Sequence, residues 1–157
     1  VVPSFLSGHA YHPRPSVSTI SNAMDVGNPS NFERILALYG GDAGAIRKDI
    51  HGYAFTDSQT GEAMRRVLSE TGYLMDPHGA VGWLGLEAYE QQLGRGGAGV
   101  FLETAHPAKF LEAVEAVTGT TIQLPPALLV LSDLKKKSIP FGKEYSQFRD
   151  WLLTELH

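Results

Sequence analysis

Thr104, at a predicted junction between two elements, is the residue best placed to do chemistry in this sequence. Residues 99–103 are mostly apolar and predict a short strand, and Pro107 predicts the start of a helix that runs to about Thr118. Ligands of open α/β folds bind where strands end and helices begin, and helix starts offer unpaired N–H groups. The Thr104 hydroxyl can therefore face a ligand such as a heterocyclic nitrogen, or it can cap the helix that follows.

Two histidines and a lysine lie near predicted helix starts. His106 can act as a general base or as a helix cap. His78 follows Asp76-Pro77, the pattern of a cap and a first-turn proline, and is predicted to be a packed or capping residue. A lysine reacts as an amine nucleophile at neutral pH only when it is desolvated, and nothing around Lys109 indicates this. No catalytic residue is assigned from these patterns.

Metal and nucleotide motifs are not indicated by the sequence. His9 and His12 have a spacing that could begin a metal site on a helix, but prolines follow at positions 13 and 15 and no helix is predicted there. A surface loop is the prediction for this segment. The glycine pairs belong to neither a G-x-G-x-x-G pattern nor a P-loop, so no nucleotide site is predicted.

Composition excludes several classes of protein. The 157 residues carry a net charge of −4, which argues against a nucleic-acid partner, because phosphate binding needs a basic face. The chain has no cysteine, which excludes thiolate sites and fits a cytoplasmic location. No apolar stretch reaches about 18 residues, so no membrane-spanning helix is predicted.

The predicted elements alternate from residue 53 onward, which favours an α/β fold with short parallel strands and crossover helices. Strands are predicted at 53–55, 73–75 and 99–103. Helices are predicted at 31–39, 42–50, 56–71, 77–93, 107–118 and 143–156. Thr56 with Gln59 forms a capping-box pattern, and Gly72 and Gly119 are expected to end their helices.

The chain is expected to be a segment of a longer protein, because it opens Val1-Val2-Pro3 without methionine and its strands are too few for a complete sheet. We divide it into a loop-rich lead-in (1–30), a part with helices and short parallel strands (31–118), and an extension with a terminal helix (119–157). An incomplete sheet leaves an open strand edge, so the segment is expected to self-associate through that edge.

Three stretches of sequence resemble one known family. Residues 19–34, which read TISNAMDVGNPSNFER, are similar to the signature of threonine synthase, and residues 103–110, ETAHPAKF, resemble a later signature of that family. Residues 73–81, which contain Asp76-Pro77-His78, are similar to a third. The order and spacing match the last third of the enzyme, so the resemblance covers essentially the whole chain.

The resemblance implies the C-terminal part of a three-layer, fold-type-II enzyme that depends on pyridoxal 5′-phosphate. The family converts O-phospho-L-homoserine and water into L-threonine and phosphate, with the cofactor as electron sink. At the position of Thr104, the family places a threonine against the pyridine nitrogen. The family's cofactor-binding lysine and phosphate-cradling loop lie upstream of the matched region, so the isolated chain is expected to be inactive and to bind no cofactor.

Two alternatives and several residue roles stay open at this stage. The chain could be a non-catalytic binding or scaffold domain derived from the same fold, or a small α/β domain with a histidine-based hydrolytic site. The second needs a nucleophile and a base in contact, and no spacing suggests such a pair. Ser21, Asn22 and Asp25 lie in the first signature without an assigned ligand, and an ordered structural loop is at least as consistent with them.

Overall fold

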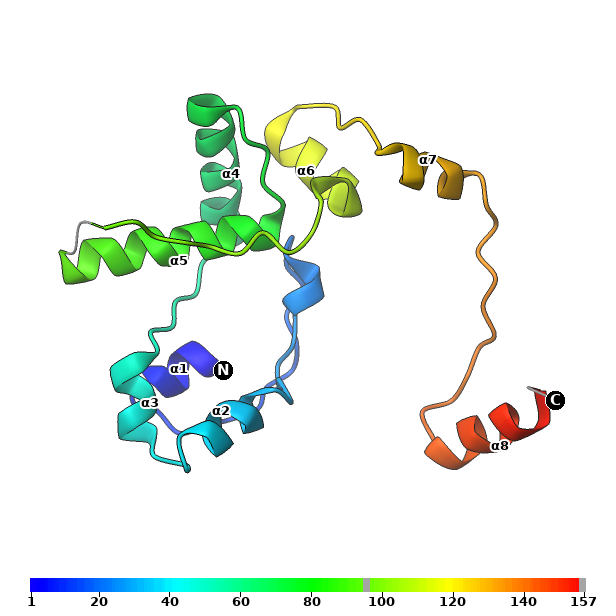
Figure 1. Cartoon of the computed structure of the whole chain (residues 1–157), viewed down its shortest axis with the longest axis horizontal. Coiled ribbons are helices and arrows are strands. Elements are labelled where there is room, and N and C mark those ends of the chain that lie inside the picture. The colour runs from blue at the N-terminus through cyan, green and yellow to red at the C-terminus, as the bar shows by residue number, and fades with distance from the viewer. Residues whose placement is uncertain (95–96, 156–157) are drawn as a thin grey trace. The chain divides into compact units, whose positions relative to one another are not determined.

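The computed structural model describes residues 1–94 and 97–155, which fall into two units, Val1–Gln123 and Leu124–His157 (Figure 1). The helices of the first unit are α1 (Val2–Leu6), the 3-10 turn η1 (Asn22–Met24), α2 (Phe32–Leu38), α3 (Ala43–Asp49), α4 (Asp57–Thr71), α5 (Pro77–Leu93), the 3-10 turn η2 (Pro107–Phe110) and α6 (Leu111–Thr118). The second unit has α7 (Pro126–Ser132) and α8 (Tyr145–Glu155). Residue 156, the end of the predicted last helix, lies outside the described residues.

Local capping signals mark the starts of α4 and α5 and the ends of α4 and α6. Thr56 and Gln59 form the predicted capping box of α4, and the Asp76 side chain caps α5 by accepting a hydrogen bond from the His78 N–H. Gly72 and Gly119 end α4 and α6 with φ values of 75° and 68°, a left-handed conformation that glycine adopts without strain. These predictions are confirmed. They could be made from the sequence because each cap depends only on residues within a few positions of it.

Two hydrophobic clusters hold the first unit together. In one, α4, α5 and α6 surround five buried side chains: Met64, Val67, Met75, Ala80 and Val114. In the other, α1, α2 and α3 pack around Phe5, Phe32 and Ile46, with the Tyr11 ring stacked on Phe32. The short helix α1 was not predicted, and Phe5 anchors it to the second cluster.

The predicted parallel strands are wrong for the residues that the structure describes, because none of these residues forms a β-strand. The segment 99–103 instead runs back along α5 (Figure 1). Gly99 lies against Leu86, Phe101 contacts Trp83 edge-on with ring centroids 5.5 Å apart, and Glu103 lies against Gly79. A strand needs a hydrogen-bonded neighbour, and this extended segment packs on a helix instead.

The predicted self-association through a sheet edge loses its basis, since no sheet is present within residues 1–94 and 97–155. The three-part division of the chain stays a prediction.

The second unit carries an aromatic cluster of its own. Phe141, Phe148 and Trp151 contact one another, with ring centroids 5.4–6.3 Å apart. They line a shallow pocket of about 710 Å³ together with Lys136 and Lys137. Across both units, none of the described helices combines the length and the apolar character that a membrane span requires.

Candidate functional site

Thr104 lies exposed in the irregular segment between the α5-packed residues 99–103 and η2. Its side chain makes no hydrogen bond within the described part of the chain. The cap of η2 is His106, whose Nδ1 accepts a hydrogen bond from the Ala108 N–H at 3.1 Å. The sequence allowed either Thr104 or His106 to cap the helix that follows. His106 is the cap, so the Thr104 hydroxyl is free to contact a ligand.

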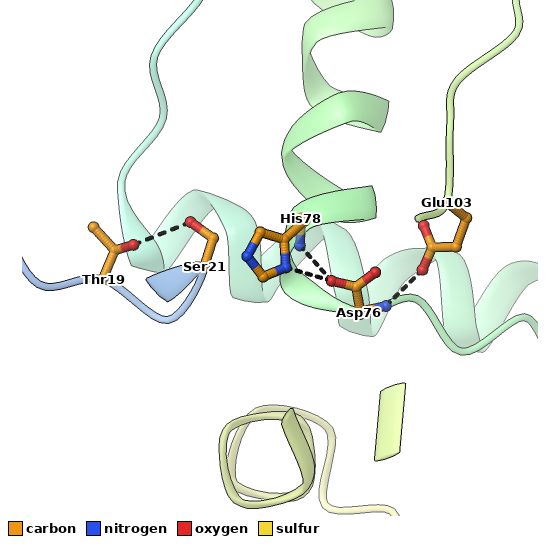
Figure 2. A network of polar contacts seen from close by, with 5 residues as sticks. All are labelled: Thr19, Ser21, Asp76, His78 and Glu103. Carbon is orange, nitrogen blue, oxygen red and sulfur yellow. Dashed lines mark hydrogen bonds and ion pairs between the residues drawn. The ribbon is translucent and has the colours of Figure 1, made fainter. Parts of the chain in front are cut away.

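Next to Thr104, a polar network joins Glu103 to the first turn of α5 (Figure 2). The Asp76 N–H donates to Glu103 Oε1 at 2.8 Å. Asp76 Oδ1 accepts a hydrogen bond from the His78 N–H at 2.8 Å and contacts His78 Nδ1 at 2.6 Å. The His78 ring also packs on Phe110 with ring centroids 4.6 Å apart, which ties the same turn of α5 to η2.

The network is buried and incomplete. The Asp76 side chain is fully buried and that of His78 is 12% exposed. Asp76 Oδ2, His78 Nε2 and Glu103 Oε2 are buried and have no hydrogen-bond partner among the described residues. Buried polar atoms nearly always have partners, so three such atoms in one cluster mark it as unusual.

Gly79 makes room for the Glu103 carboxyl. A Cβ at position 79 would overlap with Glu103 Oε2 and clash with the rest of the carboxylate. Only a glycine at this helical position therefore lets the segment 99–103 bring a carboxyl onto the first turn of α5.

Burial raises the pKa of Glu103 to about 7. The backbone hydrogen bond from Asp76 lowers the pKa, while the charge of the neighbouring Asp76 carboxylate raises it. The Glu103 carboxyl therefore keeps its proton to a higher pH than an exposed glutamate does.

The first signature segment forms an ordered loop. Asp25 accepts hydrogen bonds from the Thr19 hydroxyl at 2.6 Å and from the Thr19 N–H at 2.8 Å. Ser21 Oγ lies 3.0 Å from Thr19 Oγ1 (Figure 2). Thr19, Ser21 and Asp25 line a pocket of about 270 Å³, and Asn22 lines another of about 350 Å³ beside η2. The contacts of Asp25 support the structural interpretation of this loop.

The remaining candidates lie apart from this cluster. Lys109 is exposed, with its Nζ 5.5 Å from the centroid of the Phe110 ring, so its amine is solvated as expected. His9 Nδ1 contacts the Ser4 carbonyl and the Ser7 hydroxyl. In residues 1–94 and 97–155, no group of three or more histidine, aspartate or glutamate side chains could hold a metal ion.

Sequence reasoning missed the link between Asp76 and Glu103. It assigned Asp76 as a cap and gave Glu103 no role. One signal was present. Phe101 and Glu103 are two positions apart in an extended run, so their side chains point to the same side, and both face α5. The proximity of Glu103 to Asp76, 27 positions away, depends on the segment 99–103 running back along α5 (Figure 1) and could not be read from spacing.

Known proteins match this chain along nearly its whole length. The family model described as "Threonine synthase, C-terminal" matches residues 79–151. Threonine synthase of Serratia marcescens is 38% identical over 152 residues, which cover 97% of this chain and 34% of that protein. Threonine synthase of Escherichia coli is 38% identical over 153 residues, 98% of this chain and 35% of that protein.

The chain matches the C-terminal third of threonine synthase. This confirms the resemblance predicted from the three signatures, and the chain spans about a third of the length of the curated relatives it matches.

Solved threonine synthase structures match the fold as well. The crystal structure of the Escherichia coli enzyme aligns with a TM-score of 0.82 and 37% identity over 98% of this chain and 35% of that one. A threonine synthase from Brucella melitensis, described as bound to PLP, aligns with a TM-score of 0.68 and 31% identity over 96% of this chain and 37% of that one. The described residues thus share the fold of the C-terminal part of these enzymes.

Proposed function

We propose that this chain is the C-terminal third of a threonine synthase, which converts O-phospho-L-homoserine and water into L-threonine and phosphate. The observation that supports this proposal is the 38% identity to two threonine synthases, which extends over 97–98% of this chain and over only 34–35% of each relative. The proposal includes a fold-type-II, three-layer domain for the whole protein and a cytoplasmic location.

Pyridoxal 5′-phosphate is the cofactor of this proposal, and its ring nitrogen is the group that Thr104 would face. The exposed hydroxyl, free of hydrogen bonds to the described residues, fits this role because it can pair with the nitrogen without carrying charge. When bound, the cofactor supplies an electron sink for the carbanion that forms on the substrate. The chain itself contributes one wall of the pocket, and the lysine that binds the cofactor belongs to the upstream part of the enzyme.

The experiment compares the full-length protein with its Thr104→Asp and Thr104→Val variants. We expect the wild type to release phosphate from O-phosphohomoserine. A carboxylate at position 104 favours a protonated ring nitrogen, so Thr104→Asp should lower kcat by more than about tenfold with little change in melting temperature.

Two outcomes would contradict the proposal. Wild-type protein that neither binds the cofactor nor releases phosphate would favour the non-catalytic binding or scaffold domain. Variants that keep full turnover while their melting temperature falls would make Thr104 a structural residue only.

A further inference from the structure

Two anchors, one on each side, hold Thr104 to the same turn of α5. On one side, the Glu103 carboxyl accepts a hydrogen bond from the Asp76 N–H at 2.8 Å. On the other side, Phe110 packs on the His78 ring. Since the Thr104 side chain has no hydrogen bond of its own within the described residues, its neighbours set its position.

The Glu103 anchor is built into the fold. The extended segment brings the carboxyl inward between Phe101, which packs on Trp83, and Thr104, which stays exposed. Its Oε2 is buried against Gly79, where no side chain beyond hydrogen could fit. A carboxyl in a space of this shape has few alternative rotamers, so it fixes the backbone that leads into Thr104.

We propose that Glu103 is the positioning residue of Thr104: its carboxyl, bonded to the first turn of α5, holds the Thr104 hydroxyl where a cofactor ring nitrogen would lie. The inference rests on the proposed function, and it assigns a task to a residue whose carboxyl contacts the first turn of α5. Asp76 and His78 support it, Asp76 by donating the backbone hydrogen bond and His78 by fixing the Asp76 carboxyl (Figure 2). The raised pKa of Glu103 is consistent with it, because a protonated carboxyl adds no negative charge beside the ring nitrogen.

Glu115 provides a matched control, because its hydrogen-bond partner Ile122 packs against the same hydrophobic cluster as Phe101. Its Oε1 accepts a hydrogen bond from the Ile122 N–H at 2.9 Å, and it is half-buried like Glu103. It differs in one respect that matters here: it lies within α6 and not in the segment that carries Thr104. Loss of either carboxyl should therefore destabilise the fold similarly.

The test uses full-length protein with Glu103→Ala, Glu103→Gln and Glu115→Ala. Three quantities are measured for each: the pyridoxal phosphate concentration at half-saturation, the absorption spectrum of the bound cofactor, and the melting temperature. We expect Glu103→Ala to raise half-saturation about tenfold, the size typical of losing a group that orients another. It should also shift the bound-cofactor spectrum, while Glu115→Ala lowers the melting temperature comparably and changes neither.

Glu103→Gln should largely restore both binding and spectrum, because its amide oxygen can still accept the Asp76 N–H. The proposal is overturned if Glu103→Ala and Glu115→Ala have the same half-saturation and the same spectrum, or if Glu103→Gln is as impaired as Glu103→Ala. Wild-type protein that binds no cofactor would be a different result, since it would overturn the proposed function itself and this role with it.

Discussion

Glu103 and Gly79 are in contact, and the side chain at each position restricts which side chain can stand at the other. The carboxyl occupies the space that any side chain at position 79 would need. In turn, a glycine in the first turn of a helix carries an entropic cost that a packed neighbour can offset. Their relation can be tested by its energetic coupling, without reference to any ligand.

Gly79→Ala should destabilise the wild type and not the Glu103→Ala variant. In the wild type the new methyl group displaces the carboxyl, which we expect to cost about 1–3 kcal/mol of unfolding free energy. In the Glu103→Ala background the space is empty, and the same Gly79→Ala change should gain about 0.5–1 kcal/mol from the helix propensity of alanine. Urea unfolding of the four proteins in this double-mutant cycle measures the coupling, and additive effects would contradict the contact.

Stability should fall as pH rises toward neutrality. The pKa of Glu103 is raised to about 7 in the folded protein, so the folded state holds this proton more tightly than the unfolded state. Its contribution is complete below the ordinary pKa of 4.5 and is lost as pH rises through about 7. We expect the unfolding free energy of the wild type to decline from about pH 5 to about pH 8 more steeply than that of Glu103→Gln.

The comparison isolates Glu103 because its charged and titratable neighbours are the same in both proteins. These neighbours are Tyr73, Asp76 and His78. Parallel pH profiles for the two proteins would show that Glu103 is already ionised in the folded state.

Among the elements, the ordered loop formed by the first signature segment, residues 19–34, depends on Asp25. Its carboxylate accepts two hydrogen bonds from Thr19 and closes the loop across six residues. We expect Asp25→Ala to cost about 1–3 kcal/mol of unfolding free energy, because it leaves the part-buried Thr19 N–H without its partner. Glu33→Ala removes an exposed charge from the same signature and should change stability by less than about 0.5 kcal/mol. Equal losses for the two variants, measured by urea unfolding, would contradict this role.

The sequence was informative about elements in proportion to how local their causes are. The capping box at Thr56, the Asp76 cap and the glycine that ends α4 depend on contacts within three or four residues, and all were predicted. The strand at 99–103 was not borne out, because a short apolar run predicts an extended segment but not what it packs against. Here it pairs with α5.

The candidate site divides in the same way. The exposed position of Thr104 agrees with the junction inferred from the sequence, and His106 took one of the two roles considered for it. Glu103 could not be found from the sequence, because its burial depends on a return of the chain along α5 and on a glycine 24 positions away.

At the scale of the whole molecule, the structure does not give Lys109 the desolvated surroundings that a lysine needs to bind the cofactor covalently. Lys109, the lysine nearest to Thr104 in the sequence, is exposed and solvated. We therefore expect these 157 residues alone, mixed with pyridoxal phosphate, to give no absorption band of a lysine adduct beyond the weak one that any exposed amine gives. A stable band that disappears in Lys109→Ala would contradict this and would make Lys109 the anchor.

The alternation along residues 99–104 has a consequence for how such a pocket is completed. The side chains of Phe101 and Glu103 pack on α5. Val100 and Leu102, which alternate with them, are 84% and 77% exposed on a run that ends at Thr104. Any polypeptide that shields this valine and leucine from water also arrives at the threonine hydroxyl. Assembly of the protein and enclosure of its ligand would then be one cooperative event, so that loosening either should weaken both.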